Sequence, residues 1–119
     1  MPEKIKSYRV LEIWQRSKKF AVDIYRATEN FPRAELYGLG SQMRRAAVSI
    51  PSNIAEGFRR QSTKEKIQFL HIAYGSGAEL ETQLEMSNDL GYIKEYDVLA
   101  NELDVLMRMF NKTIQSLRQ

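Results

Sequence analysis

The sequence predicts an all-α fold, an antiparallel up-down-up-down four-helix bundle. Apolar residues recur at helical spacing in four separate stretches, and the strict alternation of a half-buried strand never persists for more than a few residues. The connections between these stretches are short, so successive helices should run antiparallel and bury their apolar stripes against one another. A chain of 119 residues has room for one core. Residues 1–119 are therefore predicted to form a single domain.

Local signals place the ends of the helices. Pro32 follows the first helix, because proline disfavours a helical conformation in the residue before it. A capping box opens the third helix, in which the Ser62 hydroxyl can accept from the amide of Glu65. Gly91 is expected to close that helix as a left-handed cap. The four helices are expected at residues 10–29, 35–57, 63–89 and 95–117.

The second helix carries conflicting signals. Gly38 and Gly40 weaken a helix that begins at residue 35, and Ser41 is an alternative N-cap. Pro51 lies inside the apolar pattern, where it removes one backbone donor, so we expect a kink near this residue. Gly57 is expected to end the helix in a left-handed conformation.

The fourth helix has the most regular apolar seam. Its members are separated alternately by three and four positions, which is the heptad rhythm typical of packed helices. They are Tyr96, Leu99, Leu103, Leu106, Phe110, Thr113 and Leu117.

Composition and spacing argue against an enzyme. The chain has no cysteine and one histidine, His71, which excludes disulfides, a thiolate nucleophile and cysteine-ligated metals. Ferritin-like bundles use Glu-x-x-His pairs, whereas the residue three positions before His71 is Gln68, so His71 is more simply a boundary residue beside an apolar stripe. No serine has the setting of a nucleophile elbow, and Gly38-Leu39-Gly40 precedes no Lys-Ser/Thr phosphate motif. We therefore expect no catalytic residue, no metal ion and no cofactor.

Hydropathy gives no sign of a membrane protein. No apolar run approaches the roughly 20 residues that a bilayer crossing needs. Residues 1–8 also lack the apolar stretch of a secretory signal. A cytoplasmic protein with no membrane partner is the expectation.

The net charge of +3 conceals a gradient along the chain. Residues 1–66 carry 14 Lys and Arg against 7 Asp and Glu, whereas residues 67–119 carry 4 against 8. The basic half favours an acidic partner, which could be RNA or DNA, an acidic protein, or the acidic half of another subunit.

Six basic residues around the second helix and the following loop are the candidate nucleic-acid contacts. Arginine offers fork-shaped donors that fit phosphate, and such a cluster would bind a nucleic-acid backbone with strong salt dependence. The alternative is structural, since Arg44 or Arg45 could pair with carboxylates such as Glu81 and Glu85 within or between subunits. The candidates are Arg44, Arg45, Arg59, Arg60, Lys64 and Lys66.

Apolar residues outside the main stripes favour a homo-oligomer. A small bundle cannot bury apolar residues on so many sides by itself, and two halves of opposite charge would suit a head-to-tail ring. The residues in question are Phe20, Val22 and Ile24 in the first helix and Val105, Met107 and Met109 in the fourth.

One long segment has a recognisable pattern. Residues 37–57, YGLGSQMRRAAVSIPSNIAEG, resemble the signature of the 23S rRNA-intervening-sequence proteins, also called the four helix bundle protein family. The resemblance extends to residues 11–15 (LEIWQ), 77–84 (GAELETQL) and 90–92 (LGY), and so covers nearly the whole chain.

The resemblance implies an antiparallel bundle assembled as a homopentameric ring, with no enzymatic activity attached to the family. A related accessory protein of diversity-generating retroelements looks like the same bundle and works with a reverse transcriptase and RNA through a basic surface. Arg44 and Arg45 lie within the segment that resembles the family signature. The other four candidates lie just outside the part of it where the resemblance is strongest. Val10 and Lys94 stand where relatives tend to carry N-caps, which weakens two helix starts.

Residues and resemblance together predict a non-enzymatic homo-oligomer, a pentamer by resemblance, that binds structured RNA through its basic surface. Such a surface would contact phosphates without reading bases. The alternative is a protein-interaction scaffold whose basic face docks an acidic partner or the neighbouring subunit.

Overall fold

The protein is an all-α bundle of four helices, as predicted. A computed structural model describes residues 7–119. Short 3-10 helices at Tyr8–Val10 (η1) and Arg33–Glu35 (η2) precede the first two long helices. The long helices are α1 (Glu12–Thr28), α2 (Leu39–Phe58), α3 (Thr63–Asp89) and α4 (Tyr96–Arg118).

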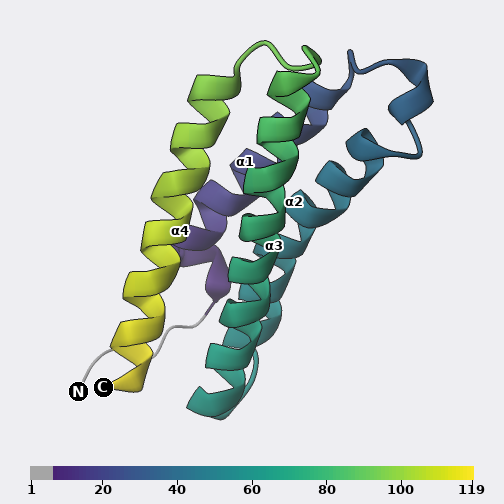
Figure 1. Cartoon of the computed structure of the whole chain (residues 1–119). Coiled ribbons are helices and arrows are strands. Elements are labelled where there is room, and N and C mark those ends of the chain that lie inside the picture. Colours follow the sequence, from purple (N-terminus) through teal and green to yellow (C-terminus); the bar gives the residue numbers. More distant parts are fainter. Residues whose placement is uncertain (1–6) are drawn as a thin grey trace.

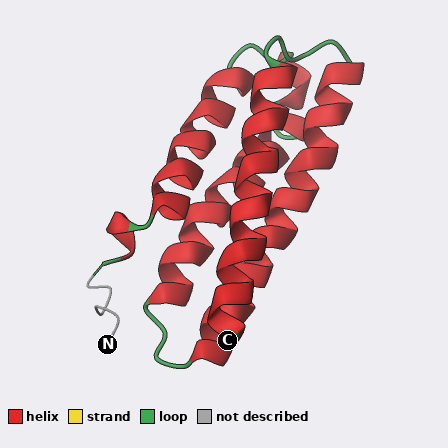
Figure 2. Ribbon diagram, turned by 90° about the vertical axis from the view of Figure 1, so that its left-hand side faces the viewer, coloured by secondary structure: helices red, strands yellow, loops and turns green. Residues whose placement is uncertain are grey.

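The four helices form one elongated bundle of 52 × 23 × 20 Å. Helix α1 packs against α2 and α4, and α3 packs against the same two neighbours, so the helices follow one another around the core with alternating direction (Figures 1 and 2). This antiparallel order brings the α2–α3 connection and the end of α4 to the same end of the bundle (Figure 1). No helix in the described part of the chain is long and apolar enough to cross a membrane.

All four helices contribute to one apolar core. The heptad seam of α4 faces this core, although Met107 and Ile114 are buried beside it as well. Large side chains with less than 2% exposure form the centre: Phe20, Ile24, Met43, Ile50, Ile54, Leu70, Leu80, Leu84, Leu103, Leu106 and Phe110.

The first two helices begin later than predicted. Helix α1 starts at Glu12, because η1 occupies the preceding residues. Helix α2 starts at Leu39, where a carboxylate oxygen of Glu35 accepts from the Leu39 amide at 3.2 Å. Ser41 lies inside α2 and is therefore not its N-cap.

Helix α2 continues past Pro51 without interruption. One turn of it also carries a side-chain bond, since the Asn53 amide donates to the Ser49 carbonyl at 2.8 Å. The proline therefore does not end the helix, and the kink near it stays a prediction.

The prediction that Gly57 is a left-handed cap is wrong. Gly57 is buried inside the last turn of α2, and among residues 7–119 only Gly91 has a positive φ, at 74°. A Cβ on Gly57 would lie 2.8 Å from the Cβ of Phe69 and 3.3 Å from the Lys66 carbonyl. The glycine is thus required by the close approach of α3 rather than by its own backbone angles.

Both ends of α3 follow the prediction. The Ser62 hydroxyl accepts from the Glu65 amide at 3.1 Å, and the Glu65 carboxylate lies 3.1 Å from the same hydroxyl. At the other end, Gly91 permits the Tyr92 amide to donate back to the Ser87 carbonyl at 2.9 Å. These caps fix where the chain enters and leaves α3.

Most of the apolar residues that suggested an oligomer are covered within the single chain. Phe20, Ile24 and Met107 are buried, and Met109 packs against the core. Of that set only Val22 is exposed, at 42%. These apolar residues therefore do not by themselves call for a second subunit, because α1 packs against α2 and α4, and α4 packs against α1 and α3.

Candidate nucleic-acid interface

The structure divides the six predicted basic residues between two places. Arg44 and Arg45 lie in the first half of α2, whereas the other four lie around the α2–α3 connection (Figure 1). Some 14 residues separate Arg45 from Arg59, which is about 21 Å along a helix. The six residues therefore form two groups rather than one continuous surface.

Arg44 holds the end of α1 against α2. Its Nε donates to the Thr28 hydroxyl at 2.8 Å, and its Nη2 donates to the Tyr25 carbonyl at 3.1 Å. The guanidinium also lies 4.7 Å from the centre of the Tyr25 ring. Its Nε and Nη2 are thus engaged within the fold, so Arg44 has a structural role and is a weaker candidate for phosphate contact than Arg45.

Arg45 is exposed and lines a groove between α2 and α3. It forms no ion pair with any of residues 7–119. The pairing with Glu81 or Glu85 that the sequence left open is therefore absent within the described chain. Arg45 remains available to a partner.

Arg60 and Lys66 at the α2–α3 connection are partly used by the fold. Arg60 lies 3.7 Å from a carboxylate oxygen of Glu56 and 3.8 Å from one of Glu65. Lys66 donates to the carbonyls of Phe58 and Arg60. Its side chain thus provides a donor at the C-terminal end of α2. Both cations stay at the surface but share their charge with local acceptors.

Arg59 and Lys64 complete this end of the bundle and are exposed. Neither forms an ion pair with any of residues 7–119. The Arg59 guanidinium lies 5.5 Å from the centre of the Tyr8 ring.

The structure adds two residues that sequence reasoning missed, Tyr8 and Arg9. The Arg9 guanidinium lies 5.1 Å from the centre of the Tyr8 ring, so Arg9 and Arg59 both lie against the same aromatic side chain. Some 50 residues separate the two arginines in the sequence, and no local pattern indicates that they meet. We call the five cations gathered here the basic end: Arg9, Arg59, Arg60, Lys64 and Lys66.

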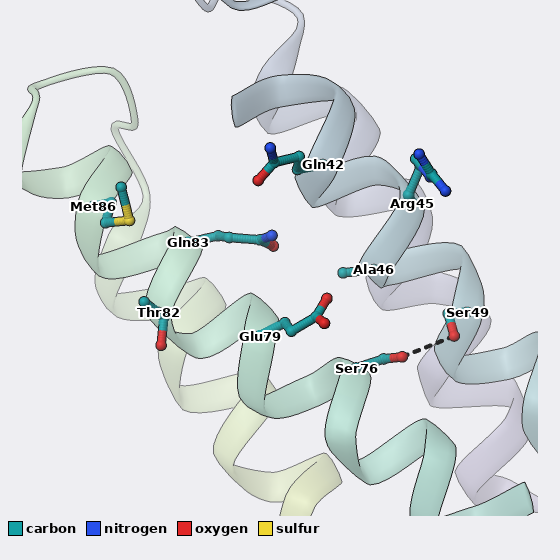
Figure 3. Close-up of a pocket in the computed structure, with 9 residues that line it drawn as sticks. All are labelled: Gln42, Arg45, Ala46, Ser49, Ser76, Glu79, Thr82, Gln83 and Met86. Carbon is teal, nitrogen blue, oxygen red and sulfur yellow. Dashed lines mark hydrogen bonds between the residues drawn. The ribbon is translucent and has the colours of Figure 1, made fainter. Parts of the chain in front are cut away.

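A groove of about 660 Å³ lies between the first half of α2 and the second half of α3 (Figure 3). Glu79 and Gln83 reach into it from α3, whereas the guanidinium of Arg45 points away from it. The Ser76 hydroxyl donates to that of Ser49 at 2.8 Å across its narrow end. The Oε1 of Gln83 is buried and has no hydrogen-bond partner, which leaves an unpaired acceptor beside the groove.

His71, the one histidine of the sequence, contacts the end of α4. It is exposed on α3, where its Nε2 lies 3.2 Å from an Arg118 nitrogen of α4. Among residues 7–119 no group of three His, Cys, Asp or Glu side chains is placed to hold a metal ion.

The sequence profile of the 23S rRNA-intervening sequence proteins matches residues 9–112. The chain belongs to this family. The matched range includes all of α1, α2 and α3 and most of α4. It also includes the five cations of the basic end and the residues that line the groove.

A solved structure has the same bundle. It is the crystal structure of a protein of unknown function from the S23 ribosomal protein family of Bacteroides thetaiotaomicron. That protein is 27% identical in sequence and superposes with a TM-score of 0.77, over 86% of this chain and 97% of its own. None of the curated proteins matches this sequence.

Proposed function

We propose that this family member is a non-enzymatic bundle that binds structured RNA through the phosphate backbone, at the basic end. The supporting observation is that η1, the end of α2 and the start of α3 bring together five cations against two carboxylates, Glu56 and Glu65. Arg9, Arg59 and Lys64 are exposed and form no ion pair within the described chain. Cations held on helix ends suit a phosphate backbone, which carries regularly spaced charge.

Salt dependence tests the proposal. If four cations of the basic end each contact a phosphate, the logarithm of the association constant should fall with the logarithm of salt concentration with a slope of about −3. We would measure the anisotropy of a labelled RNA hairpin between low and moderate salt. The double variant Arg59→Gln/Lys64→Gln should weaken binding and make the slope shallower by about 1.5, because two contacts are lost.

A control with the same change in net charge distinguishes local contact from general attraction. Arg26 in the last turn of α1 and Lys94 in the α3–α4 connection are exposed. The end of α1 and this connection lie at the opposite end of the bundle (Figure 1), so Arg26→Gln/Lys94→Gln should leave binding nearly unchanged. Absence of binding at low salt would overturn the proposal. An equal loss in both double variants would also overturn it, since the basic end would then have no special part.

The groove favours a second candidate, a scaffold that docks a neighbouring subunit or an acidic partner. Glu79, which reaches into the groove, and Arg45, at its edge, form no ion pair within the described chain. A protein surface that docks over the groove and its Arg45 edge would supply opposite charges for both side chains. Closed repetition of such a contact would give the ring that the family resemblance implies.

A further inference from the structure

Beyond the charges, the basic end contains a connected set of aromatic rings and cations. The rings of Tyr8 and Trp14 meet edge to face, with 5.2 Å between their centres and an angle of 65° between their planes. Lys18 lies 5.2 Å from the centre of the Trp14 ring, while Arg9 and Arg59 lie over Tyr8. Two adjacent rings, with cations on either side of the pair, therefore connect the side of α1 to the end of α2.

This arrangement is held in place by the backbone. The Ser7 hydroxyl accepts from the Arg9 amide at 3.1 Å and begins the short helix η1. The side chain of Gln15 then donates to the Arg9 carbonyl at 2.8 Å, which ties η1 to the first turn of α1. Tyr8 is thus positioned before any ligand binds, which lowers the entropic cost of binding.

The exposed parts of this set suit a base rather than a phosphate alone. Tyr8 and Trp14 are half-buried, and the arginines over Tyr8 are exposed. Unpaired bases stack on aromatic rings and on arginine guanidinium planes, whereas the bases of a duplex are already stacked inside it. Phosphate binding by itself would need no ring at this place.

We propose that the basic end takes unpaired nucleotides, with a base stacked on the layer formed by Tyr8, Arg9 and Arg59 while Lys64 contacts the adjoining phosphates. The inference rests on the proposed RNA binding and specifies which part of a structured RNA is bound, namely a loop or a single-stranded end. Stacking of this kind tolerates any base, so the preference is for unpaired over paired RNA rather than for a sequence.

The test compares an oligouridylate of about 12 nucleotides with an RNA duplex of the same length, by anisotropy at the same salt concentration. The single strand should bind about tenfold more tightly. Tyr8→Leu should remove about this factor for the single strand and leave duplex binding unchanged.

Because no charge is lost, Tyr8→Leu should leave the salt slope unchanged, whereas Arg59→Gln should make it shallower. Tyr8→Phe keeps the ring and should bind as the parent does.

Trp14 is the only tryptophan in the chain and gives an independent readout. A base stacked beside Tyr8 should change Trp14 fluorescence at saturation, and the duplex should change it less. If single strand and duplex bind equally and Tyr8→Leu has no effect, stacking is wrong while phosphate binding stands. If neither RNA binds at low salt, the proposed function itself fails. A shallower slope in Tyr8→Leu would show that the ring acts only by orienting the arginines, which also overturns stacking.

Discussion

The guanidinium of Arg44 bonds the hydroxyl of Thr28 at 2.8 Å and so joins the start of α2 to the end of α1. Thr28 is buried, and its hydroxyl in turn lies 2.9 Å from the carbonyl of Ile24. These contacts give a structural role to Arg44, one of the two adjacent arginines in the segment 37–57 that resembles the family signature. Its neighbour, Arg45, has no such contact.

Replacing Arg44 by alanine should lower the free energy of unfolding by about 1–2 kcal/mol, because charge-assisted hydrogen bonds to Thr28 and Tyr25 are lost at a partly exposed site. Arg45→Ala is the matched control and should change it by less than about 0.5 kcal/mol. Urea unfolding of both variants measures the difference. Equal destabilisation would show that Arg44 does not act through these contacts.

Two glycines should respond in opposite ways to alanine. Gly57→Ala places a Cβ against Phe69 and the Lys66 carbonyl, so we expect a net loss of about 1–2 kcal/mol in the free energy of unfolding. Gly75, inside α3, has nothing within 4 Å of such a Cβ. Gly75→Ala should therefore raise the stability by up to about 1 kcal/mol through helix propensity. Thermal unfolding compares the two, and a stabilising Gly57→Ala would contradict the packing argument.

Ser17 is 1% exposed, and its hydroxyl has no hydrogen-bond partner. Ser17→Ala should therefore raise the free energy of unfolding by about 1 kcal/mol, since a buried polar group without a partner is removed. In Ser87, equally buried, the hydroxyl lies 2.8 Å from the Gln83 carbonyl. The same change at Ser87 should be less favourable by at least about 1 kcal/mol. Indistinguishable effects in denaturant titrations would count against this account.

The groove between α2 and α3 allows a test of whether a second subunit binds there. Met86 lines it and Ile72 lies elsewhere on α3, with 48% and 52% exposure respectively. If a second subunit covers the groove, Met86→Glu should reduce the mass measured by light scattering to that of one chain, because the new charge would be buried without a partner. Ile72→Glu should leave the mass unchanged. A parent protein that is monomeric at every concentration would rule out docking of a second subunit at the groove.

Local sequence signals were enough to predict the helices and two of their ends. The 3.6-residue period, the Ser62 capping box and Gly91 act over one or two turns, so they are readable without the rest of the chain. The prediction for Gly57 was wrong, because close packing by α3 and a left-handed cap both require glycine, and the sequence alone does not distinguish them. The start of α2 depended on the Glu35 side chain, which reaches four residues ahead.

By itself the sequence determined the fold class, the absence of thiol chemistry and the excess of positive charge in its first half. The tertiary structure decided which of those charges are available. It engages Arg44 at the end of α1, pairs Arg60 with Glu56 and Glu65, and places Arg9 beside Arg59 around Tyr8. Charge can be counted along a chain, whereas its pairing depends on distances of a few ångström between segments far apart in sequence, and only the packed bundle sets those distances.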